Sequence, residues 1–304
     1  MGNCCNQTDK QDEIQIRPME MRPAEAVPMD PAVSGYGSGD TNHAPTNRGS
    51  DDHSPTIAKP AAQMNQPSAL AAGKQLSAFD FQAYTKPEFK DLPVLGPFKY
   101  DNGETYRGQY RLGQRHGAGT LVSADGSVYE GFWENDRGAG FVRIINSDGS
   151  VYTGNWANGL ANGQGKLISD NGDEYNGEFA SGKKAGRGTL KRANGDAYEG
   201  QFSNNAVNGV GKMVWKDGTS YTGEWKDGKV HGKGEYTWTD GQKYVGSYIA
   251  DVKEGYGEFY WPDGKVYRGN WKNGKQHGEG EYADSKGRKK QGEWADGKIV
   301  AWKS

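Results

Sequence analysis

From about residue 94 onward, apolar and polar positions alternate in short runs that recur with a fixed period. Glycine stands two residues after a recurring tyrosine and an aromatic residue stands four residues after it, while most positions between them are polar. Because side chains on a strand alternate between faces, this spacing predicts a strand with one apolar face. The tyrosine returns every 23 residues without an insertion and begins eight units, at Tyr106, Tyr129, Tyr152, Tyr175, Tyr198, Tyr221, Tyr244 and Tyr267.

The second half of each unit predicts a second strand and a tight loop. In one unit, Gly165 and Leu167 are followed by Asn-Gly, a strong hairpin signal. A three-residue loop that ends in a left-handed glycine pairs Leu167 with Tyr175 and Gly165 with Gly177, whereas a two-residue loop puts the apolar residue on the wrong face. Paired glycines would then clear space for flat aromatic rings. The other turn carries residues that tolerate positive φ, such as Gly182.

Three positions and the two ends depart from this pattern. Val142 replaces a glycine, and Phe132 and Val245 are apolar where polar residues are expected. The array begins and ends with half-units, Gly96 to Tyr100 as a second strand and Gln291 to Trp294 as a first strand.

The motif Y-x-G-x-[WFY]-x-x-G-x-x-x-G-x-G-x-[apolar], as in YTGEWKDGKVHGKGEY at 221–236, resembles the MORN repeat (membrane occupation and recognition nexus). The resemblance covers about residues 94–302. It implies an all-β fold, an elongated single-layer antiparallel sheet of tandem 23-residue hairpins that is twisted into a trough lined by aromatic residues. In this family such arrays act as scaffolds at membranes and the cytoskeleton, as dimerising rods, or as arms attached to enzymes.

The chain before the array has a different character. Residues 7–78 are rich in Pro, Ala, Gln, Ser, Asp and Met, with almost no aromatic residues. Such a segment cannot bury enough apolar surface to offset the entropy of ordering, so we expect a disordered linker. Residues 79–93 contain more aromatic residues, and we expect them to dock on the array as an N-terminal cap.

Residues 1–6, MGNCCN, suggest a lipidation signal. Gly2 fits N-myristoylation after removal of Met1, and Cys4 and Cys5 fit S-palmitoylation, although Asn6 stands where the pattern prefers Ser or Thr. One myristoyl chain anchors only marginally, so a second acyl chain is needed for stable binding. These residues predict a peripheral protein on the cytoplasmic face of the plasma membrane or another membrane, or at the cell cortex. The alternative is a chance glycine beside two inert cysteines.

Composition and charge exclude several classes. The net charge of −2 gives no basic field for nucleic acid, and no apolar run is long enough for a membrane-spanning helix. The sequence G-x-x-x-x-G-K recurs, as at 177–183, but never continues into the Ser or Thr of a phosphate-binding loop. No catalytic residue or cofactor site is identified. No metal site is expected, because the histidines that share one repeat position, His116, His231 and His277, should lie too far apart.

Two sets of residues are candidates for contacts. The first is a partner-binding aromatic face; for Trp215, Trp238 and Trp261, packing within the sheet is the alternative. The second is a set of basic residues that are either solvated or contact phosphoinositides and other acidic lipids. The aromatic set is Tyr110, Trp133, Trp156, Trp215, Trp225, Trp238, Trp261, Trp271 and Trp294, and the basic set is Lys183, Lys184, Arg187, Lys286, Arg288, Lys289 and Lys290.

We therefore expect a non-enzymatic, membrane-anchored scaffold that tethers a protein partner, such as a cytoskeletal protein. A phospholipid-binding module and a regulatory arm for a separate lipid or protein kinase or phosphatase are the alternatives. Because the end strands of an open sheet can pair with another chain, a homodimer is also expected to be accessible.

Overall fold

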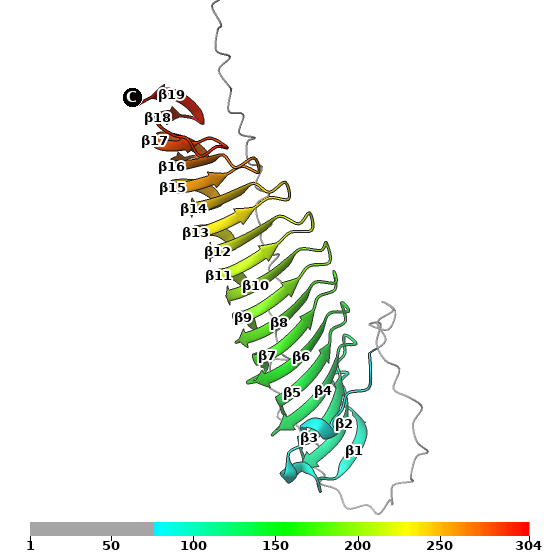
Figure 1. The fold of residues 1–304 in the computed structure, drawn as a ribbon. Helices are drawn as coiled ribbons and strands as arrows, with labels where there is room; N and C mark the ends of the chain where they lie inside the picture. Colours follow the sequence, from blue (N-terminus) through cyan, green and yellow to red (C-terminus); the bar gives the residue numbers. More distant parts are fainter. Residues whose placement is uncertain (1–75, 304) are drawn as a thin grey trace, which may run out of the picture. The chain divides into compact units, whose positions relative to one another are not determined.

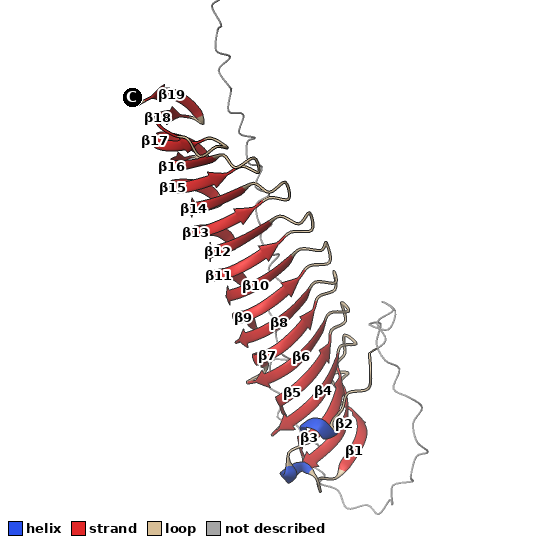
Figure 2. Cartoon of the chain, viewed as in Figure 1, coloured by secondary structure: helices blue, strands red, loops and turns tan. Residues whose placement is uncertain are grey.

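The computed structural model describes residues 76–303, and this part of the chain consists mainly of β-strands (Figure 1). These residues fall into two compact units, 76–216 and 217–303, and each is considered by itself. Within the described chain, helix is confined to two single turns before the first strand, η2 (Gln82–Tyr84) and η3 (Pro87–Phe89) (Figure 2).

The first unit contains β1 to β11, and each strand pairs antiparallel with the next along the chain. The strands are β1 (Val94–Lys99), β2 (Thr105–Arg111), β3 (Gln114–Val122), β4 (Val128–Glu134), β5 (Arg137–Ile145), β6 (Val151–Ala157), β7 (Leu160–Ile168), β8 (Glu174–Ala180), β9 (Lys183–Lys191), β10 (Ala197–Ser203) and β11 (Ala206–Val214).

The second unit contains β12 to β19 and follows the same rule. Its strands are β12 (Ser220–Lys226), β13 (Lys229–Thr237), β14 (Lys243–Ile249), β15 (Val252–Tyr260), β16 (Val266–Lys272), β17 (Lys275–Ala283), β18 (Lys289–Ala295) and β19 (Lys298–Trp302). Each unit is thus a single-layer, open antiparallel sheet of hairpins, so the predicted fold class is confirmed.

The pairing register is the one that the alternation of residues predicts. Across β7 and β8, Leu167 lies opposite Tyr175 and Gly165 lies opposite Gly177. The loop between these strands ends with Gly172 at a φ of 90°. A slip of one residue would move every aromatic ring to the other face, which is why this register dominates.

The opposite end of each hairpin is a two-residue turn. Between β8 and β9 the turn residues are Ser181, with φ at 49°, and Gly182, with φ at 78°. The sequence predicts positive φ at the glycine, and the preceding residue adopts it too because a type I′ turn requires it at both positions. Even Leu112 does so, with φ at 51°.

The tyrosine that begins each unit lies over a pair of glycines. In the β8–β9 hairpin Gly177 faces Gly188, and a Cβ atom on Gly188 would lie 2.6 Å from the Tyr175 ring. A Cβ atom on Gly177 would lie 2.5 Å from the Gly188 Cα atom. Both distances are far below van der Waals contact, so only bare backbone admits the ring, as predicted. The Tyr175 hydroxyl then donates a hydrogen bond to the Glu178 carbonyl at 2.8 Å.

A β-bulge follows each glycine pair, and a polar side chain compensates for it in several units. In β10–β11 the N–H of Val210 donates to Oε1 of Gln201 at 2.8 Å, beside the bulge residue Gly209. In β8–β9 the N–H of Arg187 donates to Oε1 of Glu178 at 3.0 Å. Because a bulge removes ladder partners, these side chains supply acceptors that the backbone no longer offers.

The unit that begins at Tyr129 accommodates Val142 in the same pairing register as the other units. Val142 lies opposite Gly131 and is fully buried. Gly138 takes over beneath the ring, since a Cβ atom there would lie 2.5 Å from the Tyr129 hydroxyl. The Tyr129 ring therefore still has space, because Gly138 provides it in place of the glycine that Val142 replaces.

The segment before β1 packs on the face of the sheet opposite the tyrosines. Tyr84 stacks on Phe141 with ring centroids 3.9 Å apart and planes at 12°, and Phe89 stacks on Phe132 at 6.1 Å. Stacked rings of this kind exclude water from both partners. This contact explains why Phe132 is apolar at a position where the repeat is otherwise polar.

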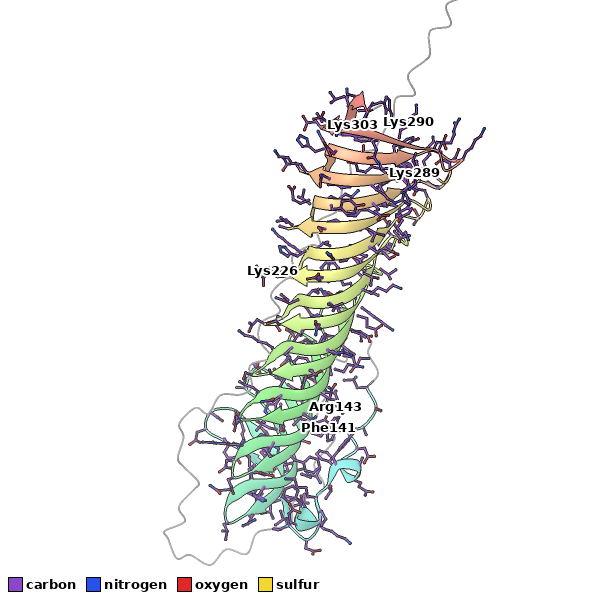
Figure 3. All side chains as sticks on the ribbon, turned by 60° about the vertical axis from the view of Figure 1, so that its left-hand side comes forward. Phe141, Arg143, Lys226, Lys289, Lys290 and Lys303 are labelled. Carbon is purple, nitrogen blue, oxygen red and sulfur yellow. The ribbon has the colours of Figure 1, made fainter. Side chains whose placement is uncertain are left out.

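Polar contacts hold the same segment. The Arg143 guanidinium donates to the Ser77 carbonyl at 2.6 Å and pairs with the Glu130 carboxylate at 2.5 Å. Figure 3 labels Phe141 and Arg143 close to each other on the sheet. Residues 76–93 are therefore fixed to the sheet by both stacking and a charge-assisted hydrogen bond.

The two ends of the array differ from a simple half-unit. At the start, Phe98 on β1 lies opposite Tyr106, as the half-unit prediction requires. At the end, the sequence analysis stops at the strand that contains Trp294, but β19 follows and places Trp302 opposite Gly292. This strand was missed because it lacks the Gly-x-apolar signal of the other units.

Candidate interaction surfaces

Most of the aromatic residues expected to bind a partner are buried within the sheet. Each packs against at least one of the repeat tyrosines; the Trp271 ring, for example, lies 5.1 Å from Tyr244 and 5.6 Å from Tyr267, edge to face. Interleaved rings cover one another, so these side chains stabilise the sheet and are not available for contact. The buried residues, each 2–4% exposed, are Trp133, Trp156, Trp225, Trp271 and Trp294.

Other rings on this face remain partly exposed. In the unit 217–303 we define the aromatic rim as Trp238, Trp261, Tyr282 and Trp302. The Tyr282 ring lies 6.3 Å from Trp261 and 6.2 Å from Trp302, and Trp302 is 43% exposed. In the unit 76–216, Tyr110 and Trp215 are half-buried. The rim is where the predicted aromatic surface meets solvent.

The side chains of the first basic cluster lie on both faces of the sheet, because successive residues of a strand point to opposite faces. Lys183 and Arg187 are exposed, whereas Lys184 is 2% exposed and its Nζ atom lies 5.5 Å from the centre of the Tyr175 ring. Lys184 therefore cannot contact a lipid head group, because it points to the aromatic face of the sheet.

The second basic cluster surrounds the last loop and is fully exposed. Arg288 pairs with Asp284 at 2.6 Å and Lys289 pairs with Glu281 at 3.1 Å. The Lys290 ammonium lies 5.4 Å from the Trp302 ring (Figure 3). Exposed ion pairs contribute little to stability, so these cations can exchange their partners for an anionic surface. The exposed basic residues here are Lys286, Arg288, Lys289 and Lys290.

An inward-facing position carries cations that the sequence analysis did not recognise as one set. It lies nine residues after the tyrosine and is occupied by Arg115, Lys184 and Lys253 in three units. The Arg115 guanidinium lies 4.6 Å from the Trp133 ring, and its Nε donates to the Asp136 carboxylate at 3.3 Å. A polar residue at an inward position is the signal that could have identified this set.

Lys253 has a different environment. Its Nζ atom lies 4.7–4.9 Å from the centres of four rings, and the side chain is 3% exposed. Within residues 76–303 no carboxylate lies within ion-pair distance of this nitrogen. Burial lowers the pKa of Lys253 to about 7, because removal from water disfavours the charged form. The four rings are those of Trp238, Tyr244, Phe259 and Trp271.

The tyrosine hydroxyls are held in their neutral form. Burial raises the pKa of Tyr198 to about 12, and it raises the pKa of Tyr221 and Tyr244 further. A protonated hydroxyl can donate, and these three do so to carbonyl groups three residues later in the chain. They act as structural donors and not as bases.

The histidines do not come together as a metal site. His116 is buried against Phe89 and its Nδ1 accepts the Asn135 N–H at 3.3 Å. Nowhere in residues 76–303 do three or more His, Cys, Asp or Glu side chains gather closely enough to hold a metal ion. In the same part of the chain, no helix has the length and apolar character needed to cross a membrane. Gly2, Cys4 and Cys5, and nearly all of the predicted linker 7–78, lie outside the described residues.

These features define a β-repeat protein built from glycine-based hairpins. The model of the MORN repeat family matches seven units that together make up more than half of the chain, and the chain belongs to this family. The unit 129–151, in which Val142 replaces a glycine, falls outside the matches. Its repeats make the chain a repeat scaffold or binding module, and the family is generally non-catalytic. The matched residues are 106–128, 152–174, 175–197, 198–220, 221–243, 244–266 and 267–287.

Comparison with solved structures gives only distant likenesses. The wild-type TCP10 domain of Danio rerio CPAP is 14% identical, with a TM-score of 0.38, over 70% of this chain and 99% of that domain. The TCP domain of Drosophila melanogaster SAS-4, solved with a proline-rich motif of Ana2, is 10% identical, with a TM-score of 0.25, over 72% and 96%. Identities and TM-scores this low do not establish a shared function. No curated protein matches the chain significantly in sequence.

Proposed function

We propose that this MORN-repeat protein is a non-enzymatic scaffold, anchored by acyl chains to the cytoplasmic face of a membrane, that tethers a protein partner. The observation that carries the proposal is the combination of a MORN-repeat array with the sequence MGNCCN at residues 1–6. The array offers packed rings and surface contacts, and the leader offers acceptors for two kinds of acyl chain.

The anchor needs both lipid types. One myristoyl chain on Gly2 binds a membrane only marginally, and a net charge of −2 supplies no polybasic second signal. Palmitoyl groups on Cys4 or Cys5 would supply the second membrane anchor. For a flexible linker of some 80 residues, scaling at about 5–6 Å times the square root of the length gives a reach of about 50 Å. A partner held by the array would thus stay near the membrane without being pressed against it.

Membrane fractionation of the full chain tests the anchor. Gly2→Ala should move the protein to the soluble fraction, because no myristate can attach. A Cys4→Ser, Cys5→Ser variant should bind weakly and be washed off, while Lys10→Ala serves as a matched leader control and should stay bound. Membrane retention of Gly2→Ala would refute the acyl anchor.

The aromatic rim is the surface best suited to a protein partner. Tryptophan and tyrosine are enriched where interfaces are tightest, because they bury a large apolar area while keeping a polar group. Proximity labelling with the full chain should lose specific neighbours when Trp261→Ser is introduced. Tyr256→Ser, on the opposite face, is the control and should keep them; equal labelling by both variants would exclude the rim.

The exposed cluster around Lys290 favours a second candidate, direct contact with anionic phospholipid. Cations beside a tryptophan suit the interface between head groups and acyl chains. The unacylated Gly2→Ala chain should pellet with anionic vesicles and not with neutral ones, and a Lys286, Arg288, Lys289, Lys290→Ser variant should fail. Absence of pelleting at low salt would remove this candidate.

A further inference from the structure

The ammonium group of Lys253 sits inside a box of aromatic rings. Each of four successive stretches of backbone supplies one wall: Trp238 follows β13, Tyr244 lies on β14, Phe259 on β15 and Trp271 on β16. The walls also touch one another, with Phe259 5.6 Å from Trp238 and 6.2 Å from Trp271, and Trp271 5.1 Å from Tyr244. An arrangement of this type is how proteins recognise methylated ammonium groups.

The distances from the nitrogen to the rings leave room for methyl groups. The Nζ atom lies 4.7–4.9 Å from all four ring centres. A C–N bond of about 1.5 Å followed by a carbon–carbon contact of about 3.5 Å gives about 5 Å from nitrogen to ring. The box can therefore accept the three methyl groups of a trimethylammonium group among its four rings.

Among residues 76–303, the Lys253 ammonium group forms no side-chain or backbone hydrogen bond and no ion pair. Tyr248, directly across from Lys253, has a buried hydroxyl with no hydrogen-bond partner. The neighbouring carboxylate of Glu254 instead accepts the N–H of Asn273 at 2.9 Å. A lysine ammonium carries three N–H donors that need acceptors when buried, whereas a trimethylammonium group carries none and keeps its charge.

We propose that Lys253 is a methylation site, and that the array holds the resulting trimethylammonium group in its own aromatic box. A separate lysine methyltransferase, with a sulfonium methyl donor, would carry out the reaction. In each round the Nζ lone pair forms the new N–C bond, the C–S bond breaks, the sulfur leaves as a neutral thioether and the displaced proton goes to solvent. Three rounds give a quaternary nitrogen that no longer titrates.

The order of synthesis gives the enzyme access to a side chain that is buried in the finished protein. Repeats of this kind contact only their neighbours, so an unfinished array can fold up to its last complete hairpin. Trp271 belongs to the unit after that of Lys253, and the box stays open until β16 is made. Methylation at that stage would be sealed in when Trp271 closes the box.

Lys184 provides a control within the same chain. It holds the same repeat position and is 2% exposed, compared with 3% for Lys253. Ser169 stands where Trp238 stands for Lys253, and Leu190 stands in place of Phe259. Two aromatic walls are thus missing, and Lys184 is expected to remain unmodified.

Mass spectrometry of the full protein, purified from the cells that naturally make it, tests the proposal. We expect trimethylation on the peptide that contains Lys253 in most molecules and none on the peptide that contains Lys184. An unmodified Lys253, or equal modification of both lysines, would overturn it.

A second measurement tests the fit of the box. In a full chain with Cys4→Ser and Cys5→Ser, Lys253→Cys is alkylated while unfolded, with either an aminoethyl or a trimethylammonium-ethyl group, and refolded. The trimethylated side chain should melt at a higher temperature than its aminoethyl counterpart, and the same pair at Lys184→Cys should show the reverse. A lower or equal melting temperature for the trimethylated form at 253 contradicts the proposal.

Discussion

The two units, residues 76–216 and 217–303, use the same hairpin but differ in what lies on their outward faces. Phe141 and Tyr256 hold the same repeat position, twelve residues after the tyrosine. Phe141 is covered by the stacked ring of Tyr84, whereas Tyr256 is 57% exposed. The repeat therefore fixes where a side chain points, and only a neighbour outside the repeat decides whether it is buried.

The inward faces differ as well. At the position just before the loop, the middle hairpins of the first unit have polar residues such as Ser123 and Ser169, with an aromatic residue at each end of the unit, Tyr100 and Trp215. The second unit has Trp238 and Trp261, followed by Asp284. This exchange provides one wall of the box around Lys253. The backbone and its glycines are common to both units, so the differences that bear on function lie at positions that the hairpin leaves free.

The largest expected effect tests what the units share. Gly177→Ala in the first unit and Gly223→Ala in the second should each cost about 3–4 kcal/mol in the free energy of unfolding, because a Cβ atom would meet backbone 2.5 Å away. Gly159→Ala and Gly228→Ala, at turns with open space, should cost about 1 kcal/mol from positive φ alone. Chemical unfolding measures all four; similar losses at both kinds of site would contradict the role of the glycine pair.

The next largest effect is a pH dependence of stability that comes from Lys253 in the second unit. Burial lowers the pKa of Lys253 to about 7 in the folded chain, below its unfolded value, so the unfolded state binds more protons between pH 7 and about 10. The stability of recombinant, unmethylated protein should thus rise by about 3 kcal/mol between pH 7 and pH 9.5. Lys253→Met should remove this rise in urea unfolding, and Lys10→Met should not. A pH profile unchanged by Lys253→Met would rule out this titration.

A smaller effect compares the two outward faces directly. Phe141→Ala should destabilise the protein by about 2 kcal/mol, because it removes the surface on which Tyr84 stacks. Tyr256→Ala should change stability by no more than about 0.5 kcal/mol. Equal losses in thermal unfolding would show that the segment 76–93 does not protect this face.

The smallest effect concerns the bulges. Gln201→Ala in the first unit and Glu224→Ala in the second should each cost about 1 kcal/mol, since each removes an acceptor from a backbone N–H at 2.8 Å and 2.9 Å. Glu224→Gln keeps an acceptor and should be nearly neutral. If Glu224→Gln costs as much as Glu224→Ala, charge and not hydrogen bonding is responsible.

Local pattern was enough to predict most of the fold. The 23-residue period, the glycine spacing and the Asn-Gly signal specify the strands, the loops and the pairing of Leu167 with Tyr175. The last strand was missed because its residues carry no such signal. Val142 is accommodated because Gly138, at a different repeat position, provides the bare backbone beneath the Tyr129 ring, which the motif does not reveal.

The surfaces were harder to predict because they depend on several units at once. Alternation places Trp156 on the aromatic face, but it does not show that neighbouring tyrosines cover the ring. The box around Lys253 joins side chains from three units at four different repeat positions, so no single motif contains it. Lys184 was assigned to the surface because other basic residues lie close to it in the sequence. Its place in the alternation of the strand directs its side chain to the buried face instead.

Each tyrosine contacts the glycines and a carbonyl group of its own hairpin, and this affects how the number of repeats could change over generations. The Tyr152 hydroxyl bonds to the Asn155 carbonyl of the same unit, and its ring rests on that unit's own glycines. Loss or gain of a whole repeat of 23 residues would leave the contacts between tyrosine and glycines intact in every remaining repeat. Loss of one residue would instead turn the side chains of a strand to the opposite faces of the sheet. The number of repeats can therefore change over generations in whole steps, while the remaining hairpins keep their structure.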